Sequence, residues 1–180
     1  MSNRSHITFV LDRTGSMEDI REDVIGGFNA FLAMQQDVQD ETTFTLVQFD
    51  SVQPYELIHK VTPIGEVPPL TRETYVPRGG TPLFDAMGYG ILALENRLSK
   101  LLEVERPDKV IFITVTDGHE NQSREFDRTR VSRMIEIKKS NGWEFVFLSA
   151  DMASFDDARS MGVNAGSSLK FSRSKRGNEA

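Results

Sequence analysis

The stretch Ile7-Thr-Phe-Val-Leu-Asp-Arg-Thr-Gly-Ser16 joins a short run of apolar and β-branched residues to a polar loop that begins with an aspartate. Three other runs, at 44–49, 110–115 and 145–148, have the same character. Short runs of this kind, about four to eight residues long, are typical of strands that are buried on both faces in a parallel sheet. The stretch therefore predicts the first strand of such a sheet, followed by a loop at its carboxyl end.

Helical patterns lie between these runs. Apolar residues recur at steps of about three or four over 20–32 and 83–101, and a third helix is expected over about 127–140, with Asn141-Gly142 as its stop signal. Residues 55–61 alternate in polarity after a short turn, which predicts an antiparallel strand at the edge of the sheet. Near the end of the chain we expect a short helix at 154–161 and a weak strand at 168–171.

The resulting order, β-α-β-β-α-β-α-β, predicts an open α/β fold of the doubly wound, Rossmann-like type. We expect a mostly parallel sheet with one antiparallel edge strand and helices on both faces. The 180 residues suit one domain, at 1–169, followed by a basic, polar and flexible tail at 170–180. The longest irregular stretch, 62–80, contains four prolines, and long loops in small domains are often functional.

Composition excludes several classes of function. The chain has no cysteine, so a zinc-thiolate site, an iron-sulfur cluster and a cysteine nucleophile are impossible. Its net charge of −6 argues against a surface that binds nucleic acid. No apolar run approaches the length of a membrane span, and the first residues lack the apolar core of a secretion signal. We therefore expect a cytoplasmic protein that binds neither nucleic acid nor membrane.

Ligands of open α/β sheets bind beyond the carboxyl ends of the strands, so functional residues are expected in the loops at that end. Three of them, at 12–16, 78–82 and 116–121, should converge there. They offer carboxylates, hydroxyls and glycines, and every side-chain metal donor in the pattern is an oxygen. Oxygen donors suit a hard divalent ion such as Mg²⁺ or Mn²⁺ and disfavour zinc or copper.

The first loop reads Asp12-Arg-Thr-Gly-Ser16, the second places Thr81 ahead of a predicted helix, and the third contains Thr116-Asp-Gly118. This pattern resembles the metal-ion-dependent adhesion site (MIDAS) of the von Willebrand factor A (vWA) family. The family motifs are Asp-x-Ser-x-Ser, a threonine ahead of a helix, and an aspartate in a Thr-Asp-Gly context. The chain departs from them at one position, where threonine replaces the first serine and keeps the hydroxyl. The residues that match in this sequence are Asp12, Thr14, Ser16, Thr81 and Asp117.

The resemblance implies a function as well as a site. The three hydroxyls and two carboxylates would hold Mg²⁺, with Mn²⁺ or Ca²⁺ as alternatives, and an Asp or Glu of a partner protein would complete the coordination shell. The expected function is a non-catalytic protein-protein interaction module. Two alternatives stay open: a metal-dependent phosphohydrolase on a Rossmann-like fold, and a scaffold subunit in which the metal is purely structural.

The phosphohydrolase alternative is weakened by the sequence. Haloacid-dehalogenase-like enzymes place Asp-x-Asp after the first strand, whereas position 14 is threonine here. A phosphate-binding Walker loop and a dinucleotide-binding glycine fingerprint are also missing from the sequence. We therefore do not expect an enzyme.

Simpler explanations exist for the same residues. Thr81 before Pro82 has the pattern of a helix N-cap, and Ser16 with Asp19 resembles a capping box. Asp12 and Asp117 could be turn residues, since aspartate is common in turns.

The sequence says less about the roles of the other aspartates, the histidines and the methionines. Asp50 and Asp151 could line the carboxyl end of the sheet beside the candidate site, although a role in starting a turn or helix is favoured. His119 and Glu120 could touch a ligand or be solvated. No catalytic role is expected for His6 or His59. Helical spacing predicts that four methionines lie in the core: Met17, Met34, Met87 and Met134.

Overall fold

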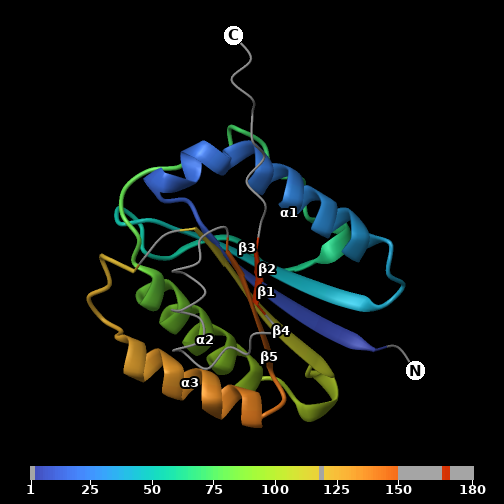
Figure 1. Cartoon of the computed structure of the whole chain (residues 1–180). Coiled ribbons are helices and arrows are strands. Elements are labelled where there is room, and N and C mark those ends of the chain that lie inside the picture. Colours follow the sequence, from blue (N-terminus) through green and yellow to red (C-terminus); the bar gives the residue numbers. More distant parts are fainter. Residues whose placement is uncertain (1–2, 118–119, 150–167, 171–180) are drawn as a thin grey trace.

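The computed structural model describes residues 3–117 and 120–149, together with the backbone of 168–170 (Figure 1). In this part of the chain, six strands form one sheet in the order β3-β2-β1-β4-β5-β6. The antiparallel pairing is that of β3 with β2, and the other four pairings are parallel. The strands are β1 (Arg4–Asp12), β2 (Glu41–Phe49), β3 (Glu56–Pro63), β4 (Lys109–Thr116), β5 (Glu144–Ser149) and β6 (Ser168–Lys170). The predicted parallel sheet with an antiparallel edge strand is therefore confirmed.

Helices cover both faces of this sheet, as predicted. Figure 1 shows α1 (Arg21–Gln36) on one face, and α2 (Leu83–Ser99) and α3 (Arg128–Ser140) together on the other. Three short 3₁₀ helices accompany them: η1 (Gly15–Ile20), η2 (Ile64–Glu66) and η3 (Glu103–Glu105). Because the sheet is covered on both sides, its central strands must be apolar on both faces, which explains their nearly continuous apolar sequence.

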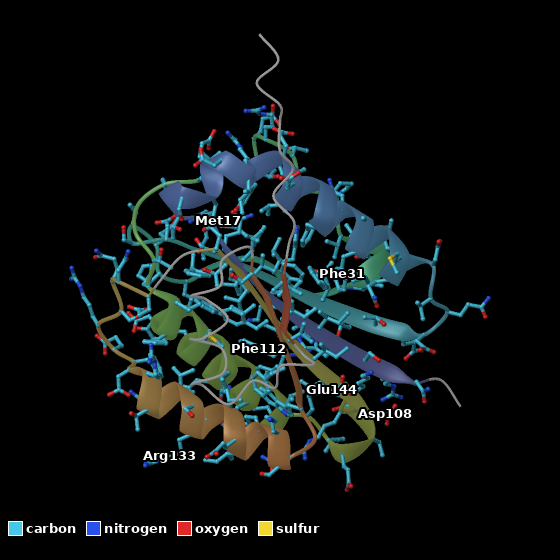
Figure 2. All side chains as sticks on the ribbon, viewed as in Figure 1. Met17, Phe31, Asp108, Phe112, Arg133 and Glu144 are labelled. Atoms are coloured by element: carbon cyan, nitrogen blue, oxygen red, sulfur yellow. The ribbon has the colours of Figure 1, made fainter. Side chains whose placement is uncertain are left out.

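Strand β1 shows how the core is divided into two layers. Phe9 and Leu11 belong to the apolar cluster on the α1 side, whereas Val10, between them, belongs to the cluster on the α2 side. Phe9 meets Phe28 of α1 edge to face, with ring centroids 5.1 Å apart. Figure 2 shows Phe112 of β4 on the α2 side of the sheet. The side chains of β1 therefore alternate between two separate cores, as the pleat of a strand requires.

Helix α3 begins and ends where the sequence predicts. The side chain of Asp127 accepts a 2.8 Å hydrogen bond from the amide of Arg130, which caps the first turn. Gly142, after the C-cap residue Asn141, has a φ of 89°, a left-handed conformation that glycine adopts without strain.

The methionine prediction is correct for three residues and wrong for one. Met17 and Met87 are fully buried, and Met134 packs against the α2 side of the core. Met34 is 69% exposed. It lies two residues after the buried Leu32, which places it about 200° around the helix from the apolar stripe.

The carboxyl-terminal expectations are only partly covered by the structure. The strand expected at 168–171 is present as β6, which pairs in parallel with β5. The short helix expected at 154–161 and the tail beyond Lys170 lie outside the described residues. In the described part of the chain, no helix has the length and apolarity needed to cross a membrane.

Candidate metal centre

Asp12 is the last residue of β1, and its carboxylate is buried at the carboxyl end of the sheet. One oxygen accepts a 2.6 Å hydrogen bond from the amide of Thr14, and the other accepts a 2.6 Å hydrogen bond from the hydroxyl of Thr116. Burial raises the pKa of Asp12 to about 6, with a smaller increase from the charge of Asp117, although the bonds from Thr116 and Thr14 oppose this shift. The site is therefore built around a carboxylate that is costly to keep charged without a cation.

The other four predicted residues are joined by a chain of side-chain oxygens. The hydroxyl of Ser16 donates to Oδ1 of Asp117 over 2.9 Å, and Oγ1 of Thr14 lies 3.4 Å from Oγ of Ser16. The hydroxyl of Thr81 donates to that of Thr14 over 3.3 Å. Asp12 joins the group through the amide of Thr14. The structure therefore brings all five residues together from three separate segments of the chain.

These oxygens fit a hard divalent cation. Ligands of Mg²⁺ lie about 2.1 Å from the ion in an octahedron, so neighbouring ligand oxygens are about 3 Å apart. The three oxygen–oxygen distances within this group, 2.9, 3.3 and 3.4 Å, are close to that spacing. Thr14, Thr81 and Asp117 are buried, whereas Ser16 is exposed. The group therefore opens to solvent on one side, where a further ligand could enter.

Helix capping does not account for Thr81 or Ser16. Helix α2 begins at Leu83 with Pro82 as its N-cap residue, and the Thr81 hydroxyl bonds to Thr14 instead of to the helix. The N-cap residue of η1 is Thr14, and no side chain caps it. The capping interpretation is therefore wrong for both residues. The turn interpretation holds in part for Asp12, because its bond to the amide two residues on closes a turn.

Backbone pairing holds the first two loops of the site side by side. The amide of Gly15 donates to the carbonyl of Gly79 over 2.9 Å, and the amide of Arg78 donates to the carbonyl of Arg13 over 2.7 Å. Gly79 has a φ of 69°, and a Cβ atom there would lie 2.6 Å from Oγ of Ser51. The left-handed conformation strongly favours glycine at this position, and the close approach to Ser51 adds to that preference.

The third loop is held by Asn121, which the sequence did not single out, and by Glu120, for which the sequence left ligand contact or solvation open. Asn121 forms two hydrogen bonds with the backbone of Thr81. Its side-chain Oδ1 accepts from the Thr81 backbone amide over 2.8 Å, and its backbone amide donates to the Thr81 carbonyl over 3.1 Å. The carboxylate of Glu120 accepts from the amide of Phe84 and from both the amide and the hydroxyl of Ser123. Glu120 therefore fastens this loop to the start of α2. His119 and Asp151 lie outside the described residues.

Asp50 has a turn role, as favoured from the sequence, and a second role that the sequence did not indicate. Its Oδ1 accepts from the amides of Val52 and Gln53, which closes the turn after β2. Its Oδ2 accepts from Nε of both Arg13 and Arg78. The only sequence signal for this second role is Arg13, which lies within the Asp12-Arg-Thr-Gly-Ser16 motif.

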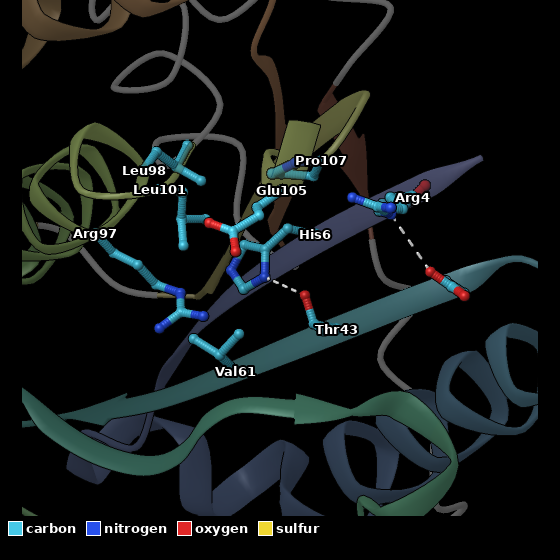
Figure 3. A pocket seen from close by; sticks show the side chains of 11 residues that line it. Arg4, His6, Thr43, Val61, Arg97, Leu98, Leu101, Glu105 and Pro107 are labelled. Carbon is cyan, nitrogen blue, oxygen red and sulfur yellow. Dashed lines mark hydrogen bonds and ion pairs between the residues drawn. The ribbon is translucent and has the colours of Figure 1, made fainter. Parts of the chain in front are cut away.

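His6 lies at the opposite end of β1 from Asp12, in a cavity of about 130 Å³ (Figure 3). Its ring nitrogens contact the hydroxyls of Thr43 at 2.8 Å and Thr8 at 3.1 Å. Burial, and then the positive charge of Arg97, lower its pKa to about 4. His6 is therefore a neutral residue of the structure, remote from the candidate metal centre.

Comparisons with known proteins identify similar structures only. No protein-family model matches this chain, and no curated protein matches it either. A solved structure of proximal thread matrix protein 1 from the mussel byssus, with a zinc-occupied MIDAS motif, has a TM-score of 0.60 at 16% identity. A von Willebrand factor type A protein from Catenulispora acidiphila has a TM-score of 0.56 at 13% identity, and the SpRpn10 VWA domain has 0.54 at 10%.

Coverage differs among these three structures. The matches cover 94%, 96% and 94% of this chain. They cover 41%, 39% and 87% of the mussel, Catenulispora and SpRpn10 chains, so this chain spans less than half the length of the first two. At such low identities the likeness concerns the fold alone. The chain therefore has the mixed-sheet α/β fold of VWA domains, with the five oxygen-bearing residues at the carboxyl end of its sheet.

Proposed function

We propose that this chain is a vWA-type protein-interaction module without catalytic activity, and that its five-residue centre binds a divalent cation. The proposal rests on one observation above all: hydroxyl and carboxylate oxygens from three segments lie in a continuous chain of contacts at the carboxyl end of the sheet. Asp12, Thr14, Ser16, Thr81 and Asp117 would hold the ion. Mg²⁺ is the first choice, with Mn²⁺ or Ca²⁺ as alternatives, because all the donors are oxygens.

The environment of Asp12 supports a bound cation. Its carboxylate is fully buried and takes part in no ion pair in the described part of the chain. A buried charge without a counter-charge is costly, and the raised pKa of Asp12 expresses that cost. A cation at the centre would remove it. The zinc-occupied MIDAS of the mussel protein is consistent with this assignment, since that structure has the same fold.

The proposed partner is a protein that presents an Asp or Glu side chain. A bound divalent ion would supply an electrophilic point at which that carboxylate can be held. Ser16, the exposed member of the centre, marks the side from which the partner would approach. Three of the five residues contribute neutral hydroxyls, so the charge of the ion would be offset by two carboxylates that also share hydrogen bonds with the protein.

Metal binding is tested by thermal unfolding during a Mg²⁺ titration. A ligand that binds only the native state stabilises it by about 2.7 kcal/mol at a concentration of one hundred times Kd. We expect Mg²⁺ to raise Tm, EDTA to reverse the increase, and Asp12→Ala to abolish it. Asp37→Ala, at the exposed end of α1, should keep the full increase. An unchanged Tm at millimolar Mg²⁺ or Mn²⁺ would contradict the proposed site.

Partner binding and the absence of catalysis need separate experiments. A protein captured on the immobilised chain in Mg²⁺ should be released by EDTA, and Thr81→Ala should fail to capture it. Capture that survives both treatments would show that the metal takes no part in that contact, either because it is purely structural or because it is irrelevant to binding. Turnover of simple phosphomonoesters in Mg²⁺ that is lost in Asp12→Ala would instead support the phosphohydrolase.

A further inference from the structure

Asp50 is a fully buried carboxylate with four hydrogen-bond donors. Two are the amides of Val52 and Gln53, at 2.7 and 2.8 Å from Oδ1. The other two are guanidinium Nε atoms, that of Arg13 at 2.6 Å and that of Arg78 at 2.9 Å, and both contact Oδ2. Two arginines on one carboxylate oxygen exceed what a surface turn requires.

The two arginines belong to two different loops of the candidate metal centre. Arg13 lies between Asp12 and Thr14, and Arg78 precedes the Gly79-Gly80-Thr81 segment. The backbones of the two loops are hydrogen-bonded directly, through the Arg78 amide and the Arg13 carbonyl. Asp50 therefore ties both loops to the end of β2 by their side chains, in addition to the bonds between their backbones.

The charges of the cluster also balance. Arg13 forms a second ion pair, with Glu56 of β3, so the two guanidinium groups face two carboxylates. Burial tends to raise the pKa of Asp50, but hydrogen bonds from Gln53, Arg13, Arg78 and Val52 outweigh it and leave the pKa below its ordinary value. Asp50 therefore stays ionised at neutral pH. Without it, Glu56 alone would face the two guanidinium groups, and a net positive charge would lie in the two loops beside the proposed cation.

We propose that Asp50 is a positioning residue of the candidate metal centre: it fixes the Arg13 and Arg78 loops in the geometry that binds the cation, and together with Glu56 it masks the two guanidinium charges that would repel the cation. This inference rests on the proposed function. Asp50 touches none of the five oxygen-bearing side chains in the structure's hydrogen bonds, so it acts through the two loops. Replacing a direct hydrogen-bond partner of a metal ligand commonly changes metal affinity by about 10- to 100-fold, and that range is the expected upper bound for Asp50.

The test is isothermal titration of the whole chain with Mg²⁺, in wild type and three variants. Asp50→Asn keeps the shape and removes the charge, and we expect its Kd to be up to about 10- to 100-fold weaker. The ratio of the Asp50→Asn Kd to the wild-type Kd should fall at higher ionic strength, because salt screens the extra repulsion from the arginines that only the variant has. The double variant Asp50→Asn with Arg78→Gln should bind Mg²⁺ more tightly than Asp50→Asn alone, since one unmasked guanidinium is gone.

Arg78→Lys is the third variant. It keeps the positive charge but loses the forked contact with Asp50 and Gln53, and we expect several-fold weaker binding. The side chain of Arg78 is 46% exposed, so this change is compatible with folding even if Asp50→Asn is not. Phe145→Leu, a core change at the start of β5, is the control: it should lower stability and leave the Kd unchanged.

The outcomes separate the two proposals. If wild type binds Mg²⁺ and both Asp50→Asn and Arg78→Lys bind it equally well, the positioning role is wrong and the proposed function stands. If the double variant is no tighter than Asp50→Asn, the masking of charge is wrong. If wild type binds no Mg²⁺ or Mn²⁺, the proposed function fails and this inference fails with it.

Discussion

The hydroxyl of Tyr75 donates a 2.6 Å hydrogen bond to the backbone carbonyl of Asp12. Tyr75 comes from the long irregular segment between β3 and α2, and it is fully buried. Burial, followed by the negative charges of Asp12 and Asp117, raises its pKa, so the phenol remains a donor at physiological pH. The segment that the sequence marks as the longest loop therefore supports the candidate metal centre from the interior of the protein.

Replacing Tyr75 with phenylalanine should destabilise the fold. The ring remains, but the Asp12 carbonyl loses its phenol donor, which costs about 1–3 kcal/mol for a buried acceptor. Urea unfolding should show a lower midpoint with an unchanged slope. Tyr89→Phe is the matched control, because its ring packs against Phe126 and its hydroxyl forms no hydrogen bond among the described residues, so its effect should be small. Equal effects of the two changes would refute the support role.

Asp12→Asn should have opposite effects on stability and on metal binding. Without metal, the wild-type carboxylate is buried and poorly compensated, so a neutral amide of the same shape should raise Tm at pH 7 in EDTA. In Mg²⁺ the order should reverse, because only the wild type gains stability. Calorimetry of both proteins in EDTA and in Mg²⁺ measures this. A variant that is less stable than wild type in EDTA would show that the carboxylate is needed structurally.

His6 should make stability depend on pH in the acid range. Its pKa in the folded chain is about 4 against 6.5 for the free side chain, so the unfolded state binds more protons between these values. The free energy of unfolding is therefore highest above pH 6.5 and falls as the pH falls towards 4, by up to about 3 kcal/mol.

Variants isolate this contribution from the titration of carboxylates. The difference in stability between pH 7 and pH 4.5 should shrink clearly in His6→Asn. It should shrink less in His59→Asn, because His59 is only half-buried, and that partial burial is what lowers its pKa. Urea unfolding at several pH values measures both profiles. If stability varied with pH in the same way in wild type and in His6→Asn, His6 would not be the source of the pH dependence.

Two glycines within helices should respond to alanine in opposite directions. A Cβ atom at Gly88 of α2 would lie 2.3 Å from the ring of Phe126, so Gly88→Ala should cost about 1–3 kcal/mol by overpacking. At Gly26 of α1 the same atom would meet nothing within 4 Å. Gly26→Ala should therefore stabilise the chain by about 0.5–1 kcal/mol, through helix propensity. Thermal unfolding of the two variants checks both signs.

Much of the fold could be predicted because its signals are local. Strand β1 is recognisable from five consecutive residues, and the alternation of 55–61 correctly indicated an edge strand. The grouping of Asp12 with Asp117 also followed, because parallel neighbours such as β1 and β4 bring their carboxyl ends together. The prediction that Met34 is buried was wrong because its position around the helix axis, at about 100° per residue, places it away from the apolar stripe.

The residues that surround the centre could not be predicted, because their contacts are not local. Arg13 and Asp50 are 37 positions apart, and Thr81 and Asn121 are 40 apart. Nothing in the composition of either loop specifies these pairs, which depend on how the loops meet in space. Tyr75 was similarly hidden in a segment that has no periodicity, although it is fully buried.

The oxygen chain from Thr81 through Ser16 to Asp117 has a consequence for the synthesis of the protein. Ser16 and Asp117 are 101 residues apart in the sequence, and their side chains meet only after β4 has been added beside β1. The first motif therefore leaves the ribosome long before its last partner exists. A growing chain that ends before β4 has no complete set of donors. A cation could therefore bind only after the central strands have assembled in their native order.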